Sequence, residues 1–383
     1  MGPVPVIAAL VLAAAALAGP AEEPHKKMFD DTLVFTGTET LAPEAGGDEI
    51  IIGLFSPDDA DHPVGRDIAR GAILAVDQAN AAGGIDERMI RIVRRWADDP
   101  WGAGANEVAR LVFDDRAWAI IGGPDGGSTH IAQQVATKAH IPLVAPVSSD
   151  PTLTQTRVPW IFRIAPNDEI QAHVLADAAV NDRSHKRIGL ITGTDHDSRT
   201  AAGELAAALQ TRGMVPAFHF EYSSTNDDLV TIAQRAAAFE PDGLMIRTPR
   251  DVVRPLIEAL GSQGFEIDLF LPWIPGALSG GFPTSYPGGI VRLQPFDLPR
   301  SCGATLKLER AFIARYGERL TPAAAYGYDA ARLVIDGLMA GAIGRVELRD
   351  RIAEMTEFTG AAGPIIWDRG GGNTAAQPVL ISR

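Results

Sequence analysis

The sequence predicts an α/β fold of two doubly wound lobes, each built around a parallel sheet. Short apolar runs alternate with longer stretches of helical spacing from Glu49 onward, as in βαβ units, where crossover helices join parallel strands. The alternation stops near Pro166 and then starts again, so the architecture repeats. A length of 383 residues also suffices for two lobes with separate cores.

Each lobe is expected to contain four strands and three helices, because its apolar runs have the length and composition of buried parallel strands. In the first lobe the expected strands are 49–55, 89–96, 117–122 and 143–145, and the helices are 66–80, 106–113 and 128–140. In the second lobe the expected strands are 187–192, 215–222, 243–246 and 267–272, and the helices are 200–212, 229–239 and 252–263. Two long amphipathic helices within 304–340 cannot form a third domain alone, so we expect them to pack on the first lobe.

The N-terminus has the features of an export signal. The stretch from Val4 to Ala18 is almost wholly apolar, and Ala16-Leu17-Ala18 before Gly19 fits the A-x-A cleavage pattern, although no Lys or Arg precedes it. The run is short for a bilayer span and no cysteine follows it, so we expect cleavage and a soluble, periplasmic protein that is not a lipoprotein. The expected division of the chain is a signal peptide at 1–18, an extension at 19–48, lobe 1 at 49–165 with 293–376, and lobe 2 at 166–292 with 377–383.

Composition argues against several kinds of partner. With 34 Lys and Arg against 48 Asp and Glu, the formal charge is −14, which disfavours binding to nucleic acid. The single cysteine, Cys302, can form neither an internal disulfide nor a CxxC metal site, and we expect it to be a small buried residue. A cluster of Asp58, Asp59, Asp61 and His62 has no fixed ligand spacing, so a solvated acidic loop is favoured over a metal site. We expect neither a metal nor a cofactor.

Several motifs occur in order along the chain and together point to a known family. They are 51–57 (IIGLFSP), 80–85 (NAAGGI), 121–123 (IGG), 146–154 (PVSSDPTLT), 162–171 (FRIAPNDEIQ), 326–331 (YGYDAA) and 363–368 (GPIIWD). With these motifs the chain resembles the type I periplasmic binding proteins, above all the leucine/isoleucine/valine receptors of ABC importers. The resemblance covers about residues 49–383. It implies two Rossmann-like lobes, three crossover segments, a small ligand in the cleft, and a membrane permease and ATPase as partners.

Candidate ligand contacts in the first lobe follow expected strands, where ligands of open parallel sheets sit. Asp125-Gly126-Gly127-Ser128 opens a helix, so its glycines and free N–H groups could receive a carboxylate. The alternative is a tight turn in which Ser128 caps its own helix. The resemblance aligns the family's usual serine with Gly126, which leaves only a backbone contact there.

A second junction in this lobe is Ser148-Ser149 before Asp150-Pro151, with helix capping as its alternative role. The resemblance aligns Ser149 with the family's ligand-binding threonine. Trp101 is a further candidate, at the rim of the lobe. At the first crossover we expect Arg163, Asp168 and Gln171 to serve hinge-side hydrogen bonding and helix capping.

Candidates in the second lobe depart from the family. Asp195 and Asp197 follow a strand within an expected loop, and a carboxylate there could hold an ammonium group or pair with Arg199. Ser198 stands where the resemblance implies a tyrosine.

Two more candidates end strands of the second lobe. Arg247 is expected to face the cleft or solvent. Trp273 could form an apolar wall or pack in the lobe core, near a position where the resemblance implies an acid that this chain lacks.

These features favour a binding protein over an enzyme. The chain has no GxSxG, Walker, HExxH or GxGxxG pattern in the required context. We expect a solute-binding component of an ABC importer that closes its hinge on a small ligand, carboxylate-bearing and amino-acid-like or aromatic. A ligand-sensing receptor that signals through a separate membrane partner is the alternative, since a fold does not fix a function.

Overall fold

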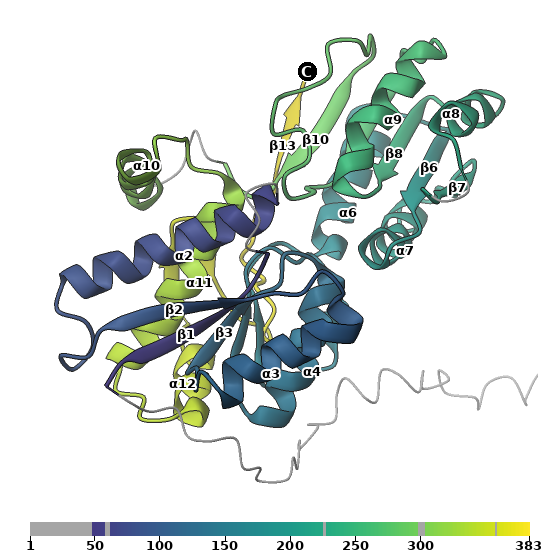
Figure 1. The fold of residues 1–383 in the computed structure, drawn as a ribbon. Coiled ribbons are helices and arrows are strands. Elements are labelled where there is room, and N and C mark those ends of the chain that lie inside the picture. Colours follow the sequence, from purple (N-terminus) through teal and green to yellow (C-terminus); the bar gives the residue numbers. More distant parts are fainter. Residues whose placement is uncertain (1–47, 58–61, 225–226, 298–302, 357) are drawn as a thin grey trace, which may run out of the picture.

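The computed structural model describes residues 48–57, 62–224, 227–297, 303–356 and 358–383. Two parallel sheets form the cores of two lobes, which confirms the predicted fold class. Figure 1 shows the first lobe around β1, β2 and β3, and the second around β6, β8 and β10. The expected signal peptide, residues 19–47 of the extension, Asp58, Asp59, Asp61, Cys302 and the side chain of Trp101 lie outside the described residues.

The first sheet has the order β2-β1-β3-β4-β5, with every pair parallel. Its strands are β1 (Ile50–Phe55), β2 (Ile90–Arg95), β3 (Ala119–Gly122), β4 (Leu143–Ala145) and β5 (Ile161–Arg163). The helical segments between them are α2 (Pro63–Ala81), η1 (Pro100–Gly104), α3 (Ala105–Phe113), α4 (Gly126–Ala139) and α5 (Thr152–Gln155). The strand order reverses between β1 and β3, so the loop from β3 to α4 lies at a topological switch point, where ligands of such sheets bind.

The second sheet has the order β13-β10-β9-β8-β6-β7 and is parallel except for the edge strand β13. Its strands are β6 (Ile188–Gly193), β7 (His219–Tyr222), β8 (Gly243–Arg247), β9 (Asp268–Leu271), β10 (Ile290–Gln294) and β13 (Val379–Ser382). The helical segments are α6 (Asp168–Ala176), η2 (Asp177–Asp182), α7 (His196–Gln210), α8 (Leu229–Ala237) and α9 (Arg250–Ser262). Here the order reverses between β6 and β8, which places the starts of α7 and α9 at the second switch point.

The chain then returns to the first lobe. The returning elements are α10 (Gly303–Tyr316), α11 (Pro322–Met339), α12 (Arg345–Ala353), β11 (Phe358–Gly360) and β12 (Gly363–Ile365). Helix α11 packs along α2 with the two backbones in close approach (Figure 1). A Cβ on Gly71 would lie 1.9 Å from the Ala324 carbonyl oxygen, and one on Gly327 would lie 2.3 Å from that of Ile68. Only glycine permits this packing at both positions.

Several expected boundaries shift because helix caps and burial decide them. Helix α7 begins at His196, not at 200, because Asp195 caps it, and α2 begins after the cap His62, not at 66. The strand expected at 215–222 starts only at His219, and Val215 is 80% exposed. Strand β10 continues to Gln294 in the second sheet, past the lobe limit expected at 292. Strands β5, β10 and β13, helices α5, α6 and α12, and the hairpin β11-β12 were not predicted.

No helix within the described ranges combines the length and apolar character needed to cross a membrane.

Candidate functional site

A cavity of about 330 Å³ lies between the two switch points and is lined by both lobes. The first lobe contributes His62, Val64, Pro124, Asp125 and Gly127. The second contributes Asp195, His196, Asp197, Arg247, Pro249, Arg250, Asp251, Ile274 and Pro275. A concave site with apolar walls and a few convergent charges is typical of a small-molecule pocket.

On the side of the first lobe, Asp125 organises the start of α4. Its Oδ1 accepts a hydrogen bond from the Ser128 N–H at 2.7 Å, and its carbonyl oxygen accepts from the hydroxyls of Ser128 and Thr129. The cap of this helix is therefore Asp125, so the interpretation of Ser128 as the capping residue is wrong. The Ser128 side chain is buried within the turn and is not among the described residues that line the cavity.

A carboxylate from the second lobe already occupies the N-terminus of α4. The Gly126 N–H donates to Asp197, with 3.0 Å to Oδ1 and 3.2 Å to Oδ2. A helix N-terminus attracts anions because its first N–H groups lack partners in the helix and its dipole is positive there. The donor that we expected to meet a ligand carboxylate is thus bonded to the protein itself.

Both aspartates of the second lobe lie at the start of a helix and not in a loop. Asp195 is the N-cap of α7, and its Oδ1 accepts from the Ser198 N–H at 3.1 Å. Asp197 lies in the first turn and faces Arg247, whose Nη2 is 3.8 Å from Asp197 Oδ2. Pairing of an aspartate with Arg199 is wrong, because Arg199 lies near Glu221.

Arg247 is the main cationic group at the end of β8. It is only 4% exposed, and its Nη1 donates to the Thr248 carbonyl oxygen at 3.1 Å. Burial raises the pKa of Asp197, while the charge of Arg247 and the Gly126 N–H oppose that rise and Asp125 adds to it. The charged groups around Asp197 are therefore mostly acidic: Asp125 and Asp195 stand against the single Arg247.

The serines after β4 contact two buried aspartates, Asp150 and Asp168. The Ser148 Oγ accepts from the Asp150 N–H at 3.4 Å, and the Ser149 carbonyl oxygen accepts from the Asp168 N–H at 2.8 Å. Burial raises the pKa of Asp168 to about 7, and the charge of Arg247 and the hydroxyl of Ser149 oppose the rise. Neither serine is among the described lining residues of the cavity.

The first crossover connects to the second lobe through Gln171. Its Oε1 accepts from the Trp273 N–H at 2.7 Å, and its Nε2 donates to the Pro166 carbonyl oxygen at 3.1 Å. The cap of α6 is Asn167, so the expected capping role of Asp168 is wrong.

The aromatic wall expected from Trp273 is not on the cavity. Its ring packs against Tyr326 with 5.7 Å between ring centroids, and within the described residues Ile274 lines the cavity instead. The apolar surface of the pocket therefore comes from aliphatic and proline side chains.

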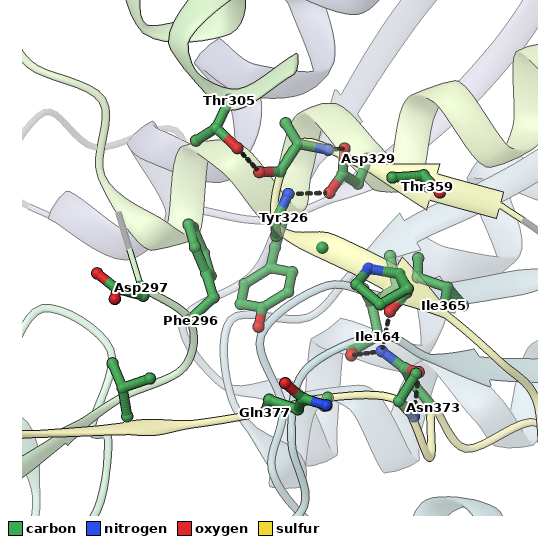
Figure 2. Close-up of a pocket in the computed structure, with 17 residues that line it drawn as sticks. Ile164, Phe296, Asp297, Thr305, Tyr326, Asp329, Thr359, Ile365, Asn373 and Gln377 are labelled. Carbon is green, nitrogen blue, oxygen red and sulfur yellow. Dashed lines mark hydrogen bonds between the residues drawn. The ribbon is translucent and has the colours of Figure 1, made fainter. Parts of the chain in front are cut away.

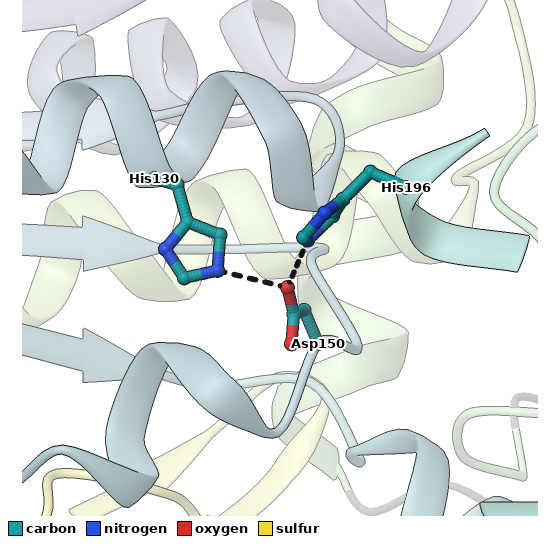
Figure 3. A group of neighbouring side chains, drawn as sticks. All are labelled: His130, Asp150 and His196. Atoms are coloured by element: carbon teal, nitrogen blue, oxygen red, sulfur yellow. Dashed lines mark hydrogen bonds and ion pairs between the residues drawn. The ribbon is translucent and has the colours of Figure 1, made fainter. Parts of the chain in front are cut away.

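Sequence reasoning missed a cluster of His130, Asp150 and His196 beside the cavity (Figure 3). Asp150 Oδ2 lies 2.9 Å from His130 Nε2 and 2.6 Å from His196 Nε2. Burial alone would raise the pKa of Asp150, but hydrogen bonds from His130, Thr152 and His196 outweigh it and hold that pKa well below its usual range. No spacing signals this cluster, because it exists only where α7 of one lobe meets α4 of the other.

A second cavity, of about 290 Å³, lies at the hinge (Figure 2). It is lined by parts of the interlobe connections, including Ile164, Phe296 and Gln377, and by Tyr326 and Asp329 of α11. The Asp329 carboxylate accepts from the N–H groups of Ala361 and Ala362 at 2.7 and 2.8 Å. The Asp329 carboxylate is thus bound to the protein's own backbone.

Comparison with known proteins agrees with this geometry. Residues 49–383 match the periplasmic binding protein family. An amino acid binding protein of Pseudomonas aeruginosa is 28% identical over 56% of this chain, and the Leu/Ile/Val-binding protein homolog 3 of Brucella melitensis is 27% identical over 54%. The matched region spans 58% and 57% of the length of these two relatives.

Solved structures share the fold. LivJ of Streptococcus pneumoniae, in complex with isoleucine, gives a TM-score of 0.77 at 20% identity and covers 87% of this chain and 100% of its own. A solute-binding protein of Rhodopseudomonas palustris, in complex with 3,4-dihydroxybenzoic acid, gives 0.74 at 17% identity and covers 88% and 93%. The fold and the family match confirm the expected resemblance: this chain belongs to the periplasmic binding protein family, in the group that resembles the leucine/isoleucine/valine-binding proteins.

Proposed function

We propose that this chain is the solute-binding component of an ABC importer and closes its two lobes on an amino-acid-type ligand. The observation that carries the proposal is the cavity between the lobes, which is lined by carboxylates of both lobes and by the buried Arg247. The proposed contacts are Asp125, Gly126 and Gly127 of the first lobe with Asp195, Asp197 and Arg247 of the second. Ser128, Ser148, Ser149 and Ser198 would support these groups from behind, and Trp273 would brace the hinge.

The charges of the cavity favour a ligand with an ammonium group. Asp125, Asp195, Asp197 and Asp251 outnumber the two arginines, Arg247 and Arg250, among the lining residues. An ammonium is costly to bury without a counter-charge, and these carboxylates supply one. The volume, at the small end of ligand pockets, suits a single amino acid.

The contact between Asp197 and Gly126 suggests how such a ligand is held. In our proposal the ligand carboxylate takes the Gly126 N–H from Asp197, and Asp197 then turns to the ligand ammonium. Ligand binding would exchange one carboxylate for another at the start of α4. The amino acid binding relative and the isoleucine complex of LivJ support this ligand class, while the dihydroxybenzoate complex makes an aromatic acid the second candidate.

Delivery to an importer adds three parts to the proposal. Residues 1–18 would direct export and be removed, a membrane permease and ATPase would read the closed form, and the ligand would leave chemically unchanged. A receptor that signals through a separate membrane partner would bind its ligand in the same way. Transport assays with and without the permease separate the two roles.

The experiment is a thermal-shift screen of amino acids, aromatic acids, amides and small peptides, because a ligand specific to the folded state raises its melting temperature. We expect an amino acid to raise the melting temperature. Asp197→Asn should then weaken binding by at least roughly 2 kcal/mol, the cost of a buried charge without its partner. Asp182→Asn, at an exposed site of the same lobe, serves as the matched control.

Binding of an amine-free acid alone, with full affinity in Asp197→Asn, would contradict the amino-acid assignment. A product that scales with protein concentration would contradict the non-enzymatic role.

A further inference from the structure

Three side chains that can bind metal meet where the lobes touch, outside the proposed contacts of the ligand. His130 belongs to α4, Asp150 follows β4, and His196 is the first residue of α7. The first two therefore come from one lobe and the third from the other. One donor atom of each, two imidazole nitrogens and a carboxylate oxygen, lies within 4.8 Å of the others.

The donor spacing is close to that of a metal centre. Metal–nitrogen and metal–oxygen bonds of about 2.1 Å place two tetrahedral ligands roughly 3.4 Å apart. The Asp150 Oδ2 lies 2.9 Å from His130 Nε2 and 2.6 Å from His196 Nε2. An ion would enter by displacing the protons between these atoms, with side-chain shifts that bring the two imidazole nitrogens, now within 4.8 Å of each other, to tetrahedral spacing.

The second oxygen of the Asp150 carboxylate is fixed by hydrogen bonds, as are many metal-ligating carboxylates. The Asp150 Oδ1 accepts from the Thr152 N–H at 2.8 Å and from the Thr152 hydroxyl at 2.7 Å. This fixes the side chain so that Oδ2 points at both imidazoles (Figure 3), and ligating carboxylates are typically oriented by such outer hydrogen bonds.

Access to the cluster is open on one side. The Asp150 side chain is fully buried, while those of His130 and His196 are 23% and 42% exposed. An ion could therefore arrive from solvent, and water could complete its coordination.

We propose that His130, Asp150 and His196 form a binding site for a divalent transition-metal ion that ties the two lobes together in the closed form. Imidazole and carboxylate donors suit Zn²⁺ and its neighbours in the first transition row. Opening the hinge removes His196 from the other two ligands, so the ion binds the closed form more tightly. By linkage, metal and solute then strengthen each other's binding. This site goes beyond the proposed function; His196 also lines the solute cavity, so metal binding is measured without solute.

The first test is metal binding to the full chain without solute, at a pH where imidazole is neutral. We expect one Zn²⁺ per chain by calorimetry and a visible absorption band when Co²⁺ is used instead. His130→Ala and His196→Ala should each weaken Zn²⁺ binding by at least roughly 100-fold, more than the loss of an outer-sphere partner. His140→Asn is the matched control, since His140 ends the same helix α4 and stacks on Trp160 instead.

A second variant separates a metal site from a simple hydrogen-bonded cluster. His196→Gln keeps an N–H donor for Asp150 but removes the imidazole ligand. We expect this variant to melt near the parent temperature without metal and to lose both the Co²⁺ band and the Zn²⁺-induced rise in melting temperature. Small-angle scattering should show that Zn²⁺ compacts the parent protein and leaves the variant unchanged.

Two results would overturn the proposal. One is Zn²⁺ affinity in His196→Gln equal to that of the parent. The other is failure of the parent to bind Zn²⁺ more tightly than the double variant of His130 and His196.

Discussion

The backbone N–H of Gly126, at the start of α4, is hydrogen-bonded to the carboxylate of Asp197, at the start of α7, with 3.0 Å between Gly126 N and Asp197 Oδ1. This bond joins residues 71 positions apart, one from each lobe. The N-termini of α4 and α7 therefore face each other across the cleft. The Asp197 carboxylate of α7 lies at the N-terminus of α4.

The glycine at this contact can be tested with its neighbour as control. A Cβ on Gly126 would lie 2.4 Å from Asp197 Oδ1, so Gly126→Ala should displace the Asp197 carboxylate and weaken this contact between the lobes. A Cβ on Gly127 would meet only Asp125 Oδ1 at 3.7 Å, an ordinary contact, so Gly127→Ala should leave the closed form intact. Small-angle scattering without ligand should show a larger radius of gyration for Gly126→Ala alone, and equal radii for the two variants would contradict this account.

Gln171 should contribute to stability through the hinge. It is buried and bonds the Trp273 N–H and the Pro166 carbonyl oxygen. Gln171→Ala leaves a buried N–H without its acceptor, which should lower the free energy of unfolding by about 1–3 kcal/mol. Urea denaturation measures this, with the exposed Gln210→Ala as control. A loss no larger than in the control would mean that the hinge does not depend on this side chain.

Substitution of Ser198 should not lower the free energy of unfolding, in contrast to substitution of Gln171. Its side chain is buried, and its Oγ has no hydrogen-bond partner among the described residues. Because Ser198→Ala removes a buried hydroxyl that makes no bond, stability by urea denaturation should be unchanged or slightly higher. A clear loss of ligand affinity in this variant, measured by calorimetry, would show instead that the hydroxyl contacts the ligand.

The buried Asp329 should make stability depend on pH. Burial raises its pKa to about 7, against the opposing effects of two backbone N–H groups and Arg332, and Tyr326 is the other titratable group beside it. Between the ordinary aspartate pKa and pH 7 the folded state binds this proton more tightly than the unfolded state. Stability from this group is therefore present at low pH and is lost as pH rises from about 4 to about 7.

Asp329→Asn removes that titration. Its melting temperature should fall less between pH 5 and pH 8 than that of the parent protein, as measured by calorimetry. The control is Asp336→Asn, on the same helix but paired with Arg332 at the surface. Identical slopes for the parent and Asp329→Asn would show that Asp329 titrates alike in the folded and unfolded states.

The fold was predictable because its signals are local. Apolar runs such as Ile50–Phe55 are buried along their whole length. The second series of alternating strands and helices in the sequence predicts the second lobe. Helix starts were missed by a few residues where an aspartate or histidine cap, as at Asp195 and His62, precedes polar helical turns. Helix α12 has little hydrophobic patterning and carries five charged residues within RVELRDRIA, so its sequence does not stand out from a loop.

The site was predictable only in outline. The positions of Asp125, Asp197 and Arg247 follow from strand ends, and all three line the cavity. Their partners do not follow, because the contact of Gly126 with Asp197 and that of Asp150 with His196 depend on the angle between the lobes. The role of Ser149 beside Asp168 also depends on a fold contact that no sequence spacing encodes.

The edge strand β13 has a consequence for how the two lobes depend on each other. It pairs antiparallel with β10 and completes the second sheet with residues Val379–Ser382. Helix α11, which packs on α2 of the first lobe, precedes it in the sequence. Each lobe is therefore assembled from segments that are distant in the sequence. Neither lobe can be produced as one continuous stretch without losing an element of its sheet or core.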